Sequence, residues 1–234
     1  MTKVEKMKAE IAAKKNPPKV EPPKDDAEFN LEVVDSIPGL IYVPEFITED
    51  EETTFVQGIE AKEWDPDLKR RVQQYGYRFH HESQHIKLWT HKDGNKIPAA
   101  EPIPDFLHPV MQRMVDAGYF PRTPEQTIIN EYLPGQGIHP HIDKTHCFEE
   151  VVASISLLTP CVMDFRHTRT FEKKSVLLPP RALLILTGES RYDWTHGIEG
   201  KETDTFNGKE FARQRRISVT FRLMDHEYLK TVKY

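Results

Sequence analysis

The sequence is poor in cysteine and contains no long apolar stretch, and each of these deficits excludes a class of protein. Its 234 residues include two cysteines, Cys147 and Cys161, too few for the disulfide framework of a small secreted domain and without a CxxC zinc-binding pair. We interpret both as structural. No apolar run approaches the roughly 20 residues of a membrane-spanning helix, and the first residues lack the apolar core of a signal peptide. We therefore expect no membrane association and a cytoplasmic or nuclear location.

The chain also has little net charge for its size. A formal charge of −5 argues against a surface devoted to nucleic acid, although a local basic patch is compatible with it. The length favours one domain with appendages, at about 150 residues per domain. Two Pro-Pro steps in a lysine-rich start predict a disordered Lys/Pro-rich tail over residues 1–35, with a docking arm as the alternative. We expect the domain over residues 36–226 and a C-terminal tail over 227–234.

Hydrophobic patterns predict two helices followed by short strands. Thr48 and Glu51 form a capping box that should begin the first helix, and a second helix should follow Pro104 and end at Gly118. The predicted strands are residues 127–133, 137–143, 151–158, 162–165, 175–178, 182–187, 194–198 and 217–223. The polar stretch 199–213 is expected to be a loop. This order predicts a mainly β (α+β) fold, a double-stranded β-helix (jelly roll) with N-terminal flanking helices.

Three side chains match a metal-binding pattern. Residues two apart on a strand share a face, so His141 and Asp143 should present an imidazole and a carboxylate side by side. His196 lies on a later predicted strand. Two histidines and one carboxylate form the facial triad of non-haem Fe(II) oxygenases, which leaves metal positions open for a cosubstrate and dioxygen. The alternative is a chance spacing, because the chain contains eleven histidines.

Polar and apolar residues alternate without interruption along the last predicted strand. Arg216, Ser218 and Arg222 share one face, and the opposite face carries Ile217, Val219, Phe221 and Leu223. A buried, unpaired arginine is costly, and a guanidinium grips a carboxylate through two parallel hydrogen bonds. This face therefore indicates an anion-binding site, unless it is exposed to solvent as on a half-solvated strand. Asn130 and Tyr132 share a face of another strand and offer an amide and a phenol to a carboxylate, or simply pack in an ordinary strand.

Together these motifs resemble the AlkB-like family of Fe(II)- and 2-oxoglutarate-dependent dioxygenases. The stretches that carry the resemblance are Ile129–Asp143, Val162–Phe165, Leu184–Tyr192, Trp194–Ile198 and Arg216–Arg222. The residues of Thr187–Tyr192 and Tyr75–Phe79 are most similar in sequence to the branch of AlkB homologue 8, the tRNA wobble-uridine hydroxylases.

The resemblance implies the residues of a catalytic site. The Fe(II) ligands would be His141, Asp143 and His196. Arg216 would pair with the distal carboxylate of 2-oxoglutarate, and the residues completing the cosubstrate pocket would be Asn130, Tyr132, Ser218 and Arg222. The chain would then use Fe(II), 2-oxoglutarate and dioxygen.

A tyrosine-rich segment offers a candidate nucleic-acid contact. Tyr75, Tyr77 and Phe79 should lie on one face of a strand with Arg78 nearby, an arrangement that suits stacking on an unpaired base beside its phosphates. The resemblance identifies this segment as the family's nucleotide-recognition lid. The alternative is that these aromatic residues pack on a half-buried sheet.

The expected activity is oxidation of a modified or alkylated nucleobase, with RNA favoured over DNA and tRNA wobble-uridine hydroxylation as the specific form. An AlkB-type oxidative demethylase, a dioxygenase of non-nucleic-acid substrates and a non-catalytic binding module stay open. A separate methyltransferase or RNA-binding protein is an expected partner, because relatives of this branch join the oxygenase domain to such modules.

Overall fold

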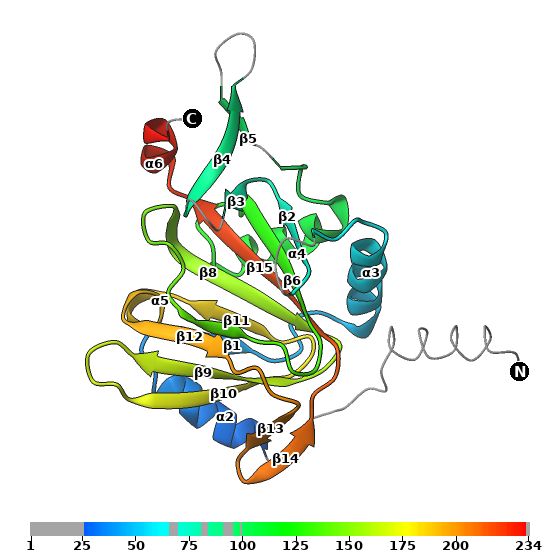
Figure 1. Ribbon diagram of the computed structural model, residues 1–234, viewed down its shortest axis with the longest axis vertical. Helices are drawn as coiled ribbons and strands as arrows, with labels where there is room; N and C mark the ends of the chain where they lie inside the picture. Colours follow the sequence, from blue (N-terminus) through cyan, green and yellow to red (C-terminus); the bar gives the residue numbers. More distant parts are fainter. Residues whose placement is uncertain (1–25, 66–69, 81–83, 91–95, 99, 233–234) are drawn as a thin grey trace, which may run out of the picture.

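Two antiparallel sheets pack face to face in the computed structural model, which describes residues 26–65, 70–80, 84–90, 96–98 and 100–232 (Figure 1). The major sheet has the order β1 (Leu40–Val43), β11 (Leu183–Leu186), β8 (Phe148–Leu157), β15 (Arg216–Met224), β6 (Gln126–Tyr132) and β2 (Val72–Tyr75). The minor sheet has the order β10 (Lys173–Leu178), β9 (Cys161–His167), β12 (Trp194–Ile198) and β7 (Ile138–His141). All eight predicted strands are present, and the jelly roll is confirmed.

Two helices cover the outer face of the major sheet. The capping box is confirmed: α3 (Glu49–Glu60) begins after Thr48, whose hydroxyl accepts from the Glu51 N–H while its own N–H donates to the Glu51 carboxylate. A short 3-10 turn, Asp105–Leu107, leads into α4 (His108–Asp116), and Pro109 lies in the first turn of α4, where a missing N–H costs nothing. The apolar face of β15 packs in the core beneath these helices, so the polar face of β15 is turned into the jelly roll.

The predicted tail boundary at residue 35 is wrong for its last ten residues. Asp26–Asp35 forms α2, which lies against β10 in Figure 1. The Asn30 side chain donates to the carbonyl of Leu177 at 3.0 Å and accepts from its N–H at 2.8 Å, and Val34 is buried in the core between the sheets. Asn30 thus satisfies the free edge of β10, which sequence composition does not reveal. The predicted tail before residue 26 lies outside the described residues.

Replacing Asn30 by alanine should lower the free energy of unfolding by about 1–3 kcal/mol, because the N–H and carbonyl of Leu177 each lose a buried partner. Denaturant unfolding followed by circular dichroism measures the change. Glu32→Ala is the matched control on the exposed side of the same helix and should stay within about 0.5 kcal/mol of the parent. Equal stability of the two variants would contradict the edge-capping role.

The stretch 199–213, expected to be a loop, instead contains a β-hairpin of β13 (Thr203–Phe206) and β14 (Lys209–Ala212). Asp204 pairs with Arg213 inside it, and Phe206 packs on β9 and β10. Buried apolar contacts therefore outweigh the polar composition of this stretch.

Further elements complete the chain. A small sheet contains β3 (Arg78–His80), β4 (His85–Thr90) and β5 (Lys96–Pro98). The helix α5 (Gly188–Tyr192) connects β11 to β12, and the predicted C-terminal tail contains the helix α6 (His226–Thr231). Within the described ranges, no helix is long and apolar enough to cross a membrane.

Candidate metal and cosubstrate site

The three predicted metal ligands meet where β7 and β12 pair in the minor sheet. His141 on β7 and His196 on β12 are direct cross-strand partners, and their ring centroids are 4.5 Å apart. One ligand atom from each histidine and from Asp143 lies within 4.8 Å of the other two. The sequence pattern predicted that His141 and Asp143 share one face of a strand. Strand β7 instead ends at His141, and Asp143 comes from the segment that follows it.

A close approach of two backbones allows this pairing. An ideal Cβ placed on Gly197 would lie 2.8 Å from the Pro140 nitrogen, well inside contact distance. Glycine beside His196 therefore lets β12 and β7 approach closely at a shift in their register, next to the pair of facing histidines.

The charge states of Asp143 and His196 suit a divalent cation. Burial would raise the pKa of Asp143, but the guanidinium of Arg222, 2.5 Å away, and the two histidines outweigh it and hold this pKa below its usual range. Burial, with repulsion from His141, lowers the pKa of His196 to about 3. His141 has its Nδ1 2.8 Å from the carbonyl of His139, which leaves Nε2 for a metal. An ionised carboxylate and neutral imidazoles are the forms that bind a metal.

Arg216 has the properties of an anion-binding residue. It is 2% exposed, and its Nη2 donates to the Ser156 hydroxyl at 2.8 Å. Within the described part of the chain, its Nε and Nη1 are buried without a hydrogen-bond partner. The alternative of a solvent-exposed strand face is therefore wrong. Two orphaned guanidinium donors in the interior fit the carboxylate of a bound small molecule.

Three of the other predicted cosubstrate residues lie beside Arg216 on β15 and β6. Strand pairing places Tyr132 opposite Arg216 and Asn130 opposite Ser218, and the Arg216 guanidinium carbon is 5.4 Å from the Tyr132 ring centroid. Arg222 lies farther along β15, where it donates to Gln126 at 3.0 Å and pairs with Asp143. It therefore contacts a metal ligand directly.

Comparisons with known proteins identify relatives whose family uses this kind of metal site. The chain is 36% identical over 212 residues to the Xenopus tropicalis protein called tRNA (carboxymethyluridine(34)-5-O)-methyltransferase alkbh8, a match covering 81% of this chain and 32% of that protein. It is 33% identical over 204 residues to the mimivirus protein L905 of Acanthamoeba polyphaga mimivirus, covering 87% and 93%. The family model described as the 2OG-Fe(II) oxygenase superfamily matches residues 39–222. The chain belongs to the AlkB family of these oxygenases. It spans about a third of the length of the frog relative.

The fold agrees with this membership. The structure of OsALKBH1 superimposes with a TM-score of 0.60 at 19% identity, covering 80% of this chain and 97% of that one. Identity this low shows the shared jelly roll alone.

As a member of the AlkB family, the chain is a 2-oxoglutarate-dependent dioxygenase with Fe(II) at the His141–Asp143–His196 triad. When bound, Fe(II) and 2-oxoglutarate supply the oxidation: dioxygen gives one oxygen atom to succinate, with release of carbon dioxide, and the other to the substrate. The residues present fit this chemistry, because the triad offers ligands from one side of the metal and Arg216 offers unpaired donors to a carboxylate.

The sequence predicted one continuous strand for the tyrosine-rich segment of this dioxygenase, but the structure divides the segment between two strands. Gly76 has φ +74, and its ideal Cβ would lie 1.9 Å from the Glu125 carbonyl, so the chain breaks between β2 and β3. Tyr75 is buried in the core of the major sheet, with its hydroxyl on Gln73. Tyr77 and Phe79 pack in a separate cluster with Phe148. Tyr75 therefore shares no face with the other two.

Sequence reasoning missed Arg191 as a site residue of the AlkB fold. This residue of α5 is 1% exposed and donates from Nη1 to the Asp143 carbonyl at 2.7 Å. It thus holds the segment that presents a metal ligand. An arginine in a short helix between two apolar strands is the signal that could have found it, and the stretch Leu184–Tyr192 had matched the family.

Proposed function

We propose that this dioxygenase hydroxylates a modified base in RNA, in the manner of a tRNA wobble-uridine hydroxylase. The observation that supports this most is the similarity to the frog alkbh8 protein over 81% of the chain, since that protein's name refers to uridine 34 of tRNA. Because the chain covers 32% of that relative, we transfer the oxygenase step alone, and a methyltransferase or RNA-binding protein would be a separate partner.

In this proposal the metal ligands are His141, Asp143 and His196. The residues that hold 2-oxoglutarate are Arg216, Asn130, Tyr132 and Ser218, with Arg222 between the pocket and Asp143. The metal and cosubstrate would thus be held inside the jelly roll, where the buried Arg216 would meet a carboxylate of the cosubstrate.

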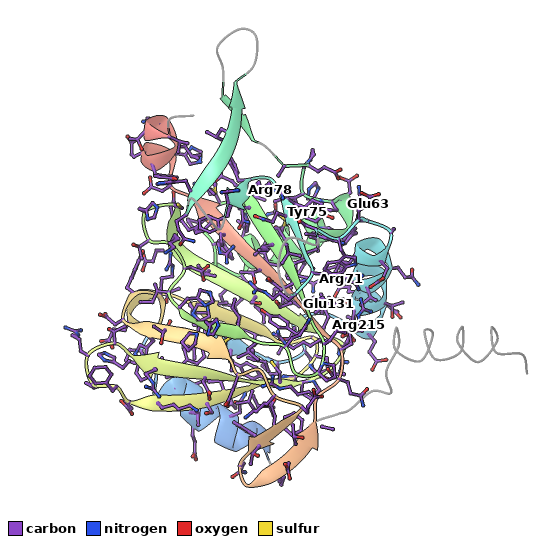
Figure 2. The ribbon with its side chains drawn as sticks, in the orientation of Figure 1. Glu63, Arg71, Tyr75, Arg78, Glu131 and Arg215 are labelled. Atoms are coloured by element: carbon purple, nitrogen blue, oxygen red, sulfur yellow. The ribbon has the colours of Figure 1, made fainter. Side chains whose placement is uncertain are left out.

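The lid in this proposal consists of Tyr77, Arg78 and Phe79. Phe79 lies 6.1 Å from the Phe148 ring, and the Phe148 ring lies 4.8 Å from the guanidinium carbon of Arg222, which pairs with Asp143. A continuous set of contacts therefore joins the lid to the metal ligand. Arg78 forms an ion pair with Asp65. The labels of Arg78, Tyr75 and Glu63 lie close together in Figure 2.

Replacing Tyr77 by alanine should raise the KM for an oligonucleotide about ten- to a hundredfold, because stacking on a base contributes about 1–3 kcal/mol. Turnover of 2-oxoglutarate without oligonucleotide should change little. The matched control is Tyr75→Phe, which removes a hydroxyl in the core and should leave the oligonucleotide KM unchanged. If Tyr77→Ala instead weakened 2-oxoglutarate and left oligonucleotide binding intact, Tyr77 would be a structural residue and the lid assignment would fail.

Incubation with tRNA, Fe(II), 2-oxoglutarate and dioxygen, followed by mass spectrometry of the nucleosides, tests the function itself. We expect a uridine derivative to gain one oxygen atom, and we expect no gain with the His196→Ala variant. Loss of a methyl group with release of formaldehyde would identify an oxidative demethylase instead. Succinate formation that no nucleic acid stimulates would contradict the RNA proposal.

A further inference from the structure

Arg70 contacts two of the residues proposed to bind 2-oxoglutarate. It lies just before β2, and its Nε donates to Oδ1 of Asn130 at 3.0 Å. Its guanidinium carbon is 6.0 Å from the centroid of the Tyr132 ring, on which Arg216 also acts. Neither the metal pattern nor the alternation of the last strand pointed to Arg70.

The hydrogen bond from Arg70 determines which way the Asn130 amide points. A guanidinium can only donate, so it must meet the amide oxygen, and the Nδ2 donors of Asn130 are left for another acceptor. Asn130 is 6% exposed and lies on the inner face of β6 opposite Ser218. A carboxylate can only accept. The Arg70 contact therefore gives Asn130 the orientation that a carboxylate requires, whereas the flipped amide would present an oxygen to it.

We propose that Arg70 is a positioning residue for 2-oxoglutarate, which acts by holding the Asn130 amide with its donors toward the cosubstrate. This inference rests on the proposed assignment of Asn130 and Arg216 to the cosubstrate pocket.

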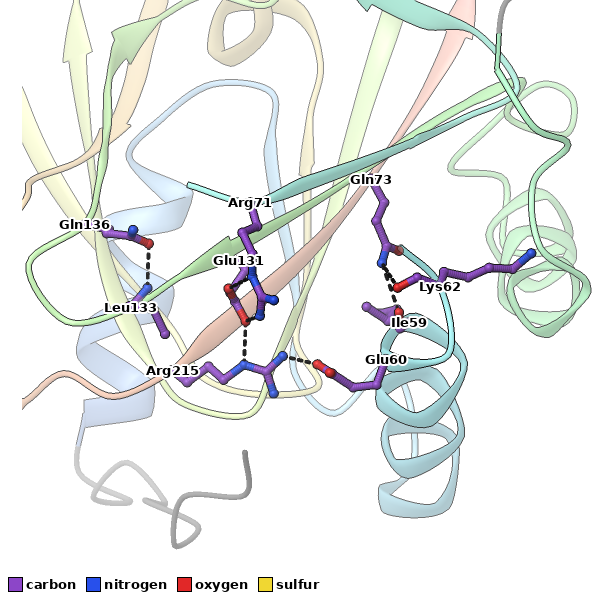
Figure 3. Close-up of polar contacts among 9 residues, drawn as sticks. All are labelled: Ile59, Glu60, Lys62, Arg71, Gln73, Glu131, Leu133, Gln136 and Arg215. Atoms are coloured by element: carbon purple, nitrogen blue, oxygen red, sulfur yellow. Dashed lines mark hydrogen bonds and ion pairs between the residues drawn. The ribbon is translucent and has the colours of Figure 1, made fainter. Parts of the chain in front are cut away.

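An ion-pair network on the outer face of the same strands holds Arg70 in place. We call Glu60, Arg71, Glu131 and Arg215 the Glu131 clasp. Arg71 donates from Nε and Nη2 to the two carboxylate oxygens of Glu131, each at 2.6 Å, and Arg215 donates from Nε to Glu131 at 2.7 Å while pairing with Glu60 at the end of α3 (Figure 3). Figure 2 shows Arg71, Glu131 and Arg215 together beside α3.

Three members of the clasp are adjacent in sequence to Arg70 or to a residue of the proposed cosubstrate pocket. Arg71 follows Arg70, Glu131 lies between Asn130 and Tyr132, and Arg215 precedes Arg216. The Glu131 N–H also donates to the Arg71 carbonyl at 3.0 Å. Alternating strand geometry turns the clasp outward and the pocket residues inward, so the clasp fixes the backbone from which Arg70 reaches Asn130.

The carboxylate at the centre of the clasp stays ionised. Burial would raise the pKa of Glu131, but hydrogen bonds from Arg71 and Arg215 outweigh it and lower this pKa. The clasp therefore keeps its charge at neutral pH and maintains the position of Arg70 there.

The test measures the Kd for 2-oxoglutarate by calorimetry on the Mn²⁺-loaded protein, together with the KM in uncoupled turnover. Arg70→Ala should raise both about five- to tenfold, the effect of losing about one hydrogen bond of ordinary net strength, and should leave the uncoupled kcat within about twofold. Arg166→Ala is the matched control. Arg166 lines the same groove of about 780 Å³ as Arg70, but it lies on the outer face of β9, and its removal should change neither constant.

Double variants separate an effect through Asn130 from general destabilisation. Adding Arg70→Ala to Asn130→Ala should weaken 2-oxoglutarate binding no further, because the amide to be oriented is gone. Asn130→Asp should weaken binding more than Asn130→Ala, because the carboxylate still accepts from Arg70 but presents an oxygen to the cosubstrate.

Three outcomes would overturn the inference. They are an unchanged Kd in Arg70→Ala, additive effects in the double variant, and binding by Asn130→Asp that matches the parent. If Asn130→Ala and Arg216→Lys weaken binding while Arg70→Ala does not, the proposed pocket stands and the role of Arg70 alone is wrong. If none of these variants changes the Kd, the pocket assignment itself fails.

Discussion

Replacing His141 or His196 by alanine is expected to abolish Fe(II)-dependent succinate formation and to leave the fold intact. Each histidine is one of three metal ligands, and a water molecule in its place would not restore a ligand geometry that is fixed by hydrogen bonds to the protein. The buried Nδ1 of His196 has no hydrogen-bond partner among the described residues, so the substitution leaves no protein group without a hydrogen bond to that atom. Equilibrium dialysis of Mn²⁺ reports binding, and thermal unfolding reports the fold.

His139→Ala is the control for these variants. His139 is an exposed histidine on the same strand as His141, and it contacts His141 through its backbone carbonyl alone, so its side chain should be dispensable for metal binding and turnover. Near-parental turnover in both ligand variants would contradict the metal assignment.

Asp143→Ala should differ from the histidine variants by also destabilising the fold. Its carboxylate pairs with the largely buried Arg222, and removing one partner of a buried ion pair costs about 3–5 kcal/mol. A reduced thermal midpoint in this variant alone distinguishes the ligand that also neutralises an arginine from the two that do not.

Arg216→Lys is expected to raise the Kd for 2-oxoglutarate roughly ten- to a hundredfold. Lysine keeps the charge but loses the planar fork that gives a carboxylate two parallel hydrogen bonds, and a hydrogen bond between charged groups contributes about 1.5–3 kcal/mol. Arg216 offers a buried guanidinium whose Nε and Nη1 are unpaired among the described residues. Calorimetry on the Mn²⁺-loaded protein measures the change directly.

The control makes the same chemical change on the outside of the jelly roll. Arg166→Lys on β9 alters an exposed arginine and should leave the Kd for 2-oxoglutarate unchanged. Comparable binding by Arg216→Lys and the parent would show that the orphaned donors of Arg216 meet something other than the cosubstrate.

The alternation of polar and apolar residues predicted the strands, because turn residues in the sequence separate each strand from the next. The alternation over Arg216–Arg222 separated the two faces of β15 correctly, and the structure buries the apolar face under helices and the arginine face in the interior. Composition misled in two places. The polar stretch 199–213 contains a hairpin held by the Asp204–Arg213 pair, and Asp26–Asp35 is a helix that caps an open strand edge. The helix depends on Leu177, far along the chain, and the hairpin on the packing of Phe206 against β9 and β10.

The sequence by itself determined the jelly roll and the inward face of Arg216, because periodicity expresses them locally, and its resemblance to the AlkB-like family indicated the metal ligands. Only the tertiary structure decided that Asp143 reaches the metal from beyond the end of its strand and that Arg222 and Arg191 hold it there. It also decided that Tyr75 is separated from Tyr77 and that Arg70 orients Asn130. Each of these depends on two segments meeting in three dimensions, where burial removes water and a charged or polar group must find its partner within the protein.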